Sequence, residues 1–176
     1  MPASSRLRLV CLAGLLTLDQ GCTAAIRTGP VPETHPRERA HRIYEALLAR
    51  GGSATQRDPG TLAGFPEAPT PVARQLRALA AAEPDRDQEP LSALHAALQG
   101  TGYYSRVRFT TRPDGGTIKY RPIATTDAKT AHAGWNALPI GFYLVWSERN
   151  GTPSSPTNEY EIIARQIEIL VHENAD

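Results

Sequence analysis

The last third of the chain alternates between apolar and polar residues, which is the pattern of half-buried β-strands. In Arg106–Arg112, one face of the predicted strand carries Val107, Phe109 and Thr111. Residues 113–116 read Pro-Asp-Gly-Gly, a composition that favours a tight turn, and the alternation then resumes over Thr117–Tyr120. A chain with this period must place one face of a sheet against a core.

Three further segments continue the β pattern. We expect a third strand over Leu138–Trp146, entered through Gly141 and covered on both sides, because apolar residues fall on both of its faces. Glu159–Ile163 and Gln166–His172 are predicted as the last strands. Before these two strands, Asn150-Gly151 marks a turn in a polar loop. Together these segments predict a small antiparallel β-sandwich over residues 103–176.

The segment before the sandwich changes to the helical period of 3.6 residues. Helices are predicted over Arg37–Arg50, from Thr70-Pro71 to Glu83, and from Pro90 to about Leu98, each with one apolar stripe. A long polar loop over residues 51–69 separates the first two. Two or three short amphipathic helices bury little surface alone, so we expect them to pack on the sandwich. The predicted fold class is therefore α+β.

The N-terminus has the features of an export signal. Arg6 and Arg8 precede the apolar run Leu9–Leu18, which is too short to cross a bilayer and suits a signal-peptide core. We therefore expect residues 1–21 to be a signal peptide, residues 22–36 to be a flexible tether and residues 37–102 to be the helical region.

Gly21-Cys22 resembles the end of a bacterial lipobox, in which the cysteine becomes the lipidated first residue of the mature protein. The alternative is ordinary cleavage near Thr23-Ala24-Ala25. The resemblance implies a membrane anchor on Cys22, and Thr23 after the cysteine favours the outer membrane. We expect an exported lipoprotein that faces the periplasm or the cell surface.

The closing segment resembles the PEGA domain, a small β-sandwich related in shape to prealbumin-like folds. Over residues 105–173 the matching positions are Val107, Phe109, Thr111, Pro113, Gly115-Gly116, Ile118, Gly141, Tyr143, Ile167, Ile169 and Val171. The resemblance implies a binding, spacing or cell-surface role and brings no catalytic residue with it.

The net charge and the absence of known catalytic or metal-binding motifs exclude several classes of function. The formal net charge is +1, and loss of Arg6, Arg8 and Asp19 with the signal lowers it to zero, which argues against nucleic-acid binding. No pair of histidines has metal-ligand spacing, and no Gly-x-Ser-x-Gly motif or phosphate-binding loop is present. We therefore expect no catalytic residue, no metal and no cofactor.

The aromatic residues give the one positive indication of binding. Trp135, Tyr103 and Tyr104 do not fit the alternation of the core, so they are candidates for exposed contact residues. The leading hypothesis is a non-catalytic envelope lipoprotein whose sandwich binds an unknown envelope protein or acts as a spacer. The alternatives are a module that binds peptidoglycan or another polysaccharide, and an uncharacterised hydrolase.

Overall fold

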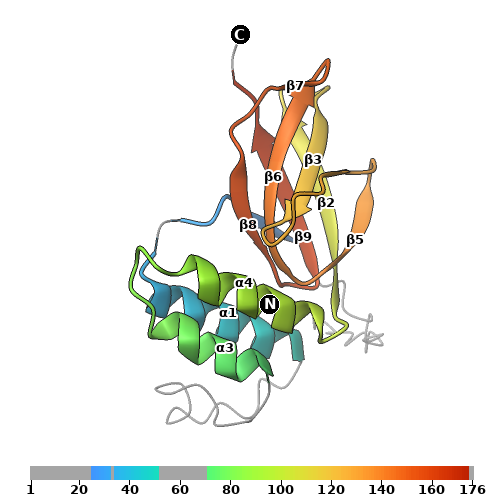
Figure 1. The fold of residues 1–176 in the computed structure, drawn as a ribbon. Helices are drawn as coiled ribbons and strands as arrows, with labels where there is room; N and C mark the ends of the chain where they lie inside the picture. Colours follow the sequence, from blue (N-terminus) through green and yellow to red (C-terminus); the bar gives the residue numbers. More distant parts are fainter. Residues whose placement is uncertain (1–24, 33, 52–70, 175–176) are drawn as a thin grey trace, which may run out of the picture.

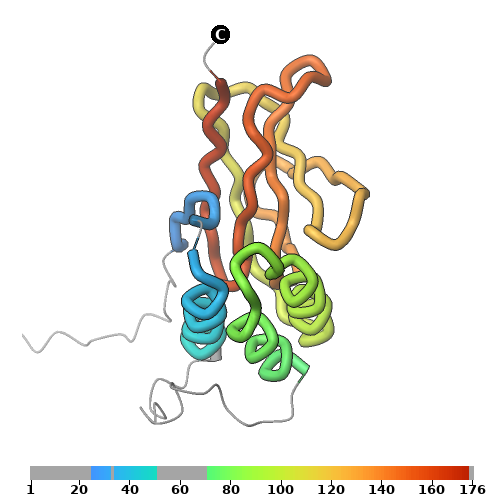
Figure 2. Tube along the Cα trace, turned by 60° about the vertical axis from the view of Figure 1, so that its left-hand side comes forward, coloured from blue at the N-terminus to red at the C-terminus, as the bar shows by residue number. Residues whose placement is uncertain are grey.

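The computed structural model describes residues 25–32, 34–51 and 71–174, and within them it is an α+β structure (Figure 1). Two β-sheets stand face to face, and a layer of helices lies at one end of them (Figures 1 and 2). The predicted signal peptide, Cys22 and residues 52–69 of the predicted loop 51–69 fall outside the described residues, whereas Gly51 is the last residue of the first helix. Within the described residues, no helix is long and apolar enough to span a bilayer.

The first sheet, sheet A, contains β1 (Ile26–Thr28), β9 (Gln166–His172), β2 (Tyr104–Arg112) and β5 (Trp135–Pro139), in that spatial order. β1 and β2 are both parallel to β9, and β5 is antiparallel to β2. The prediction of a flexible tether over residues 22–36 is therefore wrong for Ile26–Thr28. The backbone of these three residues extends the edge of sheet A by pairing with Ile167–Ile169.

The second sheet, sheet B, is antiparallel. Its strands are β4 (Lys129–Thr130), β3 (Thr117–Pro122), β6 (Gly141–Arg149) and β7 (Thr152–Pro153), with β8 (Asn158–Ile162) also paired to β6. The turn between β6 and β7 has positive φ angles at Asn150 and Gly151, as the Asn-Gly signal predicts. The Pro-Asp-Gly-Gly turn joins β2 to β3 and so crosses between the sheets.

The predicted third strand, 138–146, is in fact two strands. Leu138 belongs to β5 in sheet A, whereas Gly141 begins β6 in sheet B. The chain changes sheets at Ile140, between the two strands. The next residue, Gly141, has a φ of 156°, and a Cβ there would lie 2.5 Å from His95 Nδ1. The residues before and after Ile140 are apolar in both strands, so the sequence pattern did not reveal where one strand ends and the next begins.

The main core fills the space between the two sheets. It contains Val107, Phe109, Ile118, Tyr120, Leu138, Tyr143, Val145, Tyr160, Ile162, Ile167, Ile169 and Val171. The predicted inward faces of β2, β3 and β9 are confirmed. In β6 the residues that face this core are Tyr143 and Val145, while Trp146 is only half-buried on the opposite side.

A second core joins the helices to the lower end of sheet B. The helices are α1 (Pro36–Gly51), α3 (Pro71–Ala80) and α4 (Gln88–Gln99). They pack on strand residues through Ala40, Ile43, Leu76, Leu79, Leu91, Leu94, Leu98, Ile140, Phe142 and Ile163. The expectation that the helices pack on the sandwich is confirmed, and among the described residues no helix covers the outer face of sheet A (Figure 1).

Two buried polar contacts attach the helical layer. Arg39 of α1 has a side chain only 7% exposed, lies over the Phe142 ring, and forms ion pairs with Asp87, Glu159 and Glu161. His95 of α4 accepts a hydrogen bond at Nδ1 from the Phe142 N–H at 3.0 Å. Burial lowers the pKa of His95, so the ring is neutral and able to accept this bond near pH 7.

Candidate functional site

The outer face of sheet A carries a row of charged and aromatic side chains that crosses all four strands. In the sheet register, Arg27 of β1 lies beside Glu168 of β9, Glu168 beside Arg108 of β2, and Arg108 beside Trp135 of β5. Glu168 contacts the guanidinium groups of Arg27 at 3.2 Å and Arg108 at 3.9 Å. Register therefore brings together residues that are far apart in the sequence.

Positive charge dominates this surface, which we call the arginine face. It consists of Arg27, Arg106, Arg108, Arg112, Glu168 and Trp135, and so has four guanidinium groups against one carboxylate. The Arg106 guanidinium carbon lies 5.2 Å from the centre of the Trp135 ring. Planar guanidinium groups pair with carboxylates or phosphates and stack on aromatic rings. The arginine face therefore carries the side-chain types that pair with anionic groups and stack on aromatic rings.

Two large aromatic side chains are exposed at the end of sheet A where β2 begins. Tyr103 is 56% exposed and Tyr104 58%. The Arg50 guanidinium lies over the Tyr103 ring at 5.5 Å and donates to the Tyr104 carbonyl. Arg165 in turn donates to the Arg50 carbonyl at 2.8 Å. We call these four residues, Arg50, Tyr103, Tyr104 and Arg165, the end patch.

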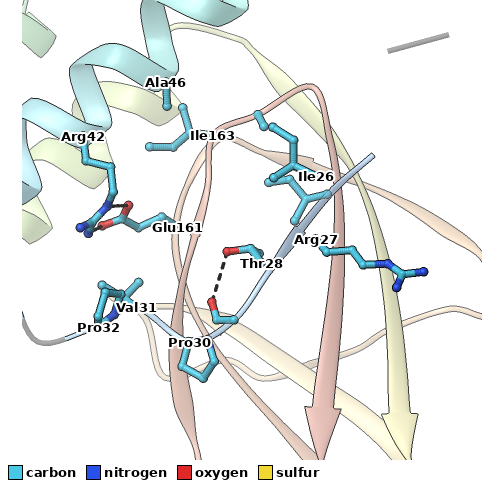
Figure 3. Close-up of a pocket in the computed structure, with 13 residues that line it drawn as sticks. Ile26, Arg27, Thr28, Pro30, Val31, Pro32, Arg42, Ala46, Glu161 and Ile163 are labelled. Atoms are coloured by element: carbon cyan, nitrogen blue, oxygen red, sulfur yellow. Dashed lines mark hydrogen bonds and ion pairs between the residues drawn. The ribbon is translucent and has the colours of Figure 1, made fainter. Parts of the chain in front are cut away.

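A pocket of about 400 Å³ lies beside β1, between this strand and α1 (Figure 3). Its wall is apolar at Ile26, Ile163 and Ala46, and the Arg42–Glu161 ion pair, at 2.9 Å, forms its polar side (Figure 3). The carboxylate of Glu161 also accepts a hydrogen bond from Arg39. Because these charged groups neutralise one another, the pocket presents no free acid or base to a ligand.

The polar residues at the opposite end of the sandwich form a structural clamp. The Glu173 carboxylate, 1% exposed, accepts hydrogen bonds from Arg149 Nε at 2.7 Å and from Ser154 Oγ at 3.0 Å. The hydrogen bond from Arg149 is the main reason that the pKa of Glu173 is lowered. The ionised carboxylate thus joins the end of β9 to β6 and to the segment after β7.

In the described part of the chain, every buried side-chain nitrogen and oxygen has a hydrogen-bond partner, and no three His, Cys, Asp or Glu side chains are grouped as a metal site would need. Burial raises the pKa of Tyr143 to about 12, so this phenol stays protonated. Its O–H donates to the Pro139 carbonyl at 2.7 Å.

The structure places the predicted binding residues in two groups. Trp135, 39% exposed, belongs to the arginine face, whereas Tyr103 and Tyr104 belong to the end patch. Tyr160, another aromatic residue of this region, is 1% exposed and forms part of the core. Cys22 lies outside the described residues.

Sequence reasoning missed the arginines that surround these aromatics. The alternation of Arg106, Arg108 and Arg112 along one strand was a visible signal, but the net charge of the chain concealed it. Arg27 and Glu168 join the arginine face only through the pairing of β1 with β9, which no local pattern indicates.

Comparison with known proteins adds no further constraint. The chain matches no protein-family model, no curated protein and no solved structure.

Proposed function

We propose that this chain is an exported, lipid-anchored and non-catalytic module of the bacterial envelope, and that the arginine face is its contact surface for an acidic protein partner. The observation that carries the proposal is the outer face of sheet A, which no helix of the described residues covers and where four arginines stand against one glutamate. A surface of this kind steers an acidic partner during encounter and fixes its orientation.

Several features support a binding role over a passive one. The arginine side chains extend from paired strands, so the sheet holds them at fixed spacings. Trp135 supplies an apolar surface under Arg106, and tryptophan and arginine are common energetic centres of protein interfaces. A PEGA-like fold, proposed on the residues matched above, agrees with a module that binds or spaces.

Crosslinking tests the arginine face directly. A photoreactive residue in place of Thr110, which is exposed on this face, should capture a partner in the native envelope. The matched control is Lys119, which points away from the core on the opposite sheet and should not capture the same protein. Arg108→Glu should abolish capture at Thr110; equal capture at both positions would contradict the proposal.

The lipid anchor has its own test. Cys22→Ala should move the protein from the membrane fraction to the soluble fraction. A wild-type protein that is acylated, with an outer-membrane location in fractionated cells, would support both the anchor and the sorting inferred from Thr23. Unchanged membrane association of the variant would rule out lipidation at Cys22.

A second candidate function is binding of peptidoglycan or another polysaccharide. The exposed Trp135 ring favours it, because aromatic faces stack on sugar rings and Arg106 beside it could bind a carboxylate. Wild-type protein should then sediment with purified peptidoglycan, and Trp135→Ala should not. The glycan candidate is rejected if wild type stays in the supernatant.

A further inference from the structure

The end patch contains two of the three most exposed large apolar side chains of the described residues. Tyr103 and Tyr104 are more than half exposed, whereas Trp135 and Leu170 are 39% and 38% exposed. Such side chains are costly to leave in water when they are grouped, and a grouped set marks a contact surface. Tyrosine in particular suits a boundary between water and an apolar phase, because its ring is apolar and its hydroxyl is polar.

Two arginines complete the end patch and give it positive charge. Arg50 donates to the carbonyls of Ile163 and Tyr104, and Arg165 donates to the carbonyl of Arg50. Burial is the main cause of the lowered pKa of Arg50, and the nearby charge of Arg165 lowers it further. The two guanidinium groups are therefore close enough to repel each other, and an anionic surface would relieve this repulsion.

The chain direction places the end patch next to the proposed lipid anchor. β1 and β2 both run parallel to β9, so the chain enters β1 from the end of sheet A at which Tyr103 and Tyr104 lie. Only Thr23 and Ala24 separate Cys22 from Ala25, the first described residue. Three Cα–Cα steps span at most about 11 Å, so an acylated Cys22 cannot hold this end far from a membrane.

We propose that the end patch rests on the anionic surface of the bilayer to which Cys22 is anchored, with Tyr103 and Tyr104 at the level of the lipid headgroups. This inference depends on the proposed lipidation. Tyrosine is enriched at membrane interfaces, and arginine side chains there can bind phosphate groups while their stems cover apolar surface. β2 and β9 then lead away from the membrane and leave the arginine face open to a partner.

A fluorescent probe can report the depth of each end of sheet A. The mature protein, acylated at Cys22, is reconstituted into phosphatidylglycerol-rich vesicles, with a single introduced cysteine labelled at Ala137→Cys or Thr110→Cys. Ala137 lies beside Arg106, close to the end patch, whereas Thr110 is six residues beyond Tyr104, or about 20 Å along the strand. Lipids that carry a quencher at the headgroup should quench the probe at Ala137 several-fold more than the probe at Thr110.

Variants of the end patch provide the controls. Tyr103→Ser with Tyr104→Ser should remove the difference between the two probes, whereas the double change to Phe should retain most of it. Leu170→Ser, an exposed apolar residue elsewhere on the same face, should have no effect. Phosphatidylcholine vesicles should give weaker quenching at Ala137, because they offer Arg50 and Arg165 no net negative charge.

Each contrary result has a separate meaning. If wild type without an introduced cysteine takes the thiol label, or if its mass shows that cleavage near Thr23-Ala24-Ala25 has removed Cys22, both the lipid anchor and this inference are wrong. If Cys22 is blocked but both probes are quenched equally, or if the serine variant behaves as wild type, the bilayer contact alone is wrong. An absence of quenching in every vesicle would leave the end patch to a protein partner and would also overturn the inference.

Discussion

His95 connects the helical layer to sheet B through one hydrogen bond that only the neutral imidazole can accept at Nδ1. The ring is 4% exposed and accepts from the Phe142 N–H. In a protonated ring, Nδ1–H would be a donor that faces the N–H donor of Phe142, and the buried site gives neither group access to water. Protonation of His95 therefore opposes the packing of α4 on the strand.

This arrangement predicts that stability falls in mildly acidic solution. The pKa of His95 is lowered in the folded protein, so the unfolded chain takes up a proton first, near the ordinary value of ~6.5. The stabilising effect of the neutral ring is complete above that pH and is lost as the pH falls towards the lower folded-state pKa. Urea unfolding between pH 7.5 and 5.5, a range chosen to bracket that ordinary value, should show this loss. His95→Leu should flatten the pH dependence, and His172→Asn, at an exposed position, should not.

We expect that even a methyl side chain at position 141 destabilises the protein. A Cβ at this position would lie 2.5 Å from His95 Nδ1, and the buried ring has little space to move. Gly141→Ala should therefore lower the free energy of unfolding by about 1–3 kcal/mol. Gly29→Ala is the matched control, because its Cβ would meet no atom within 4 Å. Equal effects in denaturant titrations would show that the contact with His95 is unimportant.

At the scale of elements, α1 is held on sheet B by charge as well as by apolar contact. Arg39 Nε lies 3.0 Å from Glu161 Oε1, and Arg39 Nη1 lies 3.8 Å from Asp87 Oδ2 at the start of α4. One side chain thus links α1, β8 and the N-terminal end of α4. Loss of this arginine would leave the carboxylates without their common partner.

We expect Arg39→Ala to be among the most destabilising changes in the helical region. Removal of one member of a buried ion pair typically costs about 3–5 kcal/mol. Arg86→Ala is a suitable control, because the Arg86–Glu83 pair is exposed on both sides, 78% and 69%, and such pairs contribute ~1 kcal/mol or less. Thermal unfolding should separate the two variants clearly. Similar midpoints would mean that apolar contacts alone hold α1.

Local pattern predicts elements in this chain better than it predicts their connections. β2 and β9 were predictable because Val107, Phe109, Ile167 and Ile169 alternate strictly. The break at Ile140 was not, because both strands that flank it are apolar. Residues of β1 lie in a segment rich in glycine and proline, and only their pairing with β9 makes them a strand.

In the candidate site, too, the local sequence predicts individual residues but not which of them come together. Trp135, Tyr103 and Tyr104 could be singled out because they break the alternation of the core. Their assignment to two surfaces depends on which strands are neighbours. Arg50 reaches Tyr103 from the end of α1, and Arg27 reaches Glu168 from the N-terminal edge. Contacts of this range are set by the tertiary fold and are absent from any local window.

At the scale of the whole molecule, β9 is the strand on which sheet A depends. It lies between β1 and β2, and its Ile167, Ile169 and Val171 are each at most 2% exposed. A chain that ends after Arg165 would leave β2 with one neighbour and open the core to water.

We therefore predict that a chain truncated after Arg165 does not fold. Its near-ultraviolet circular dichroism should be lost and its proteolysis should accelerate by at least about tenfold, as expected for a loss of more than ~1.4 kcal/mol. A chain that ends after Asn174 is the control, because it keeps β9 and the clamp around Glu173, and it should resist protease like the full chain. A protected truncated chain would contradict the central role of β9.

The position of β9 also has a consequence for biosynthesis. Sheet A cannot close until Gln166–His172 has left the ribosome, because β1 and β2 pair only through this strand. Pairing across so long a stretch of chain is slow to form. For a protein that is exported as we propose, this delay keeps the emerging chain unfolded and competent for translocation. The sandwich would then be completed on the far side of the membrane, after the N-terminus has already been processed.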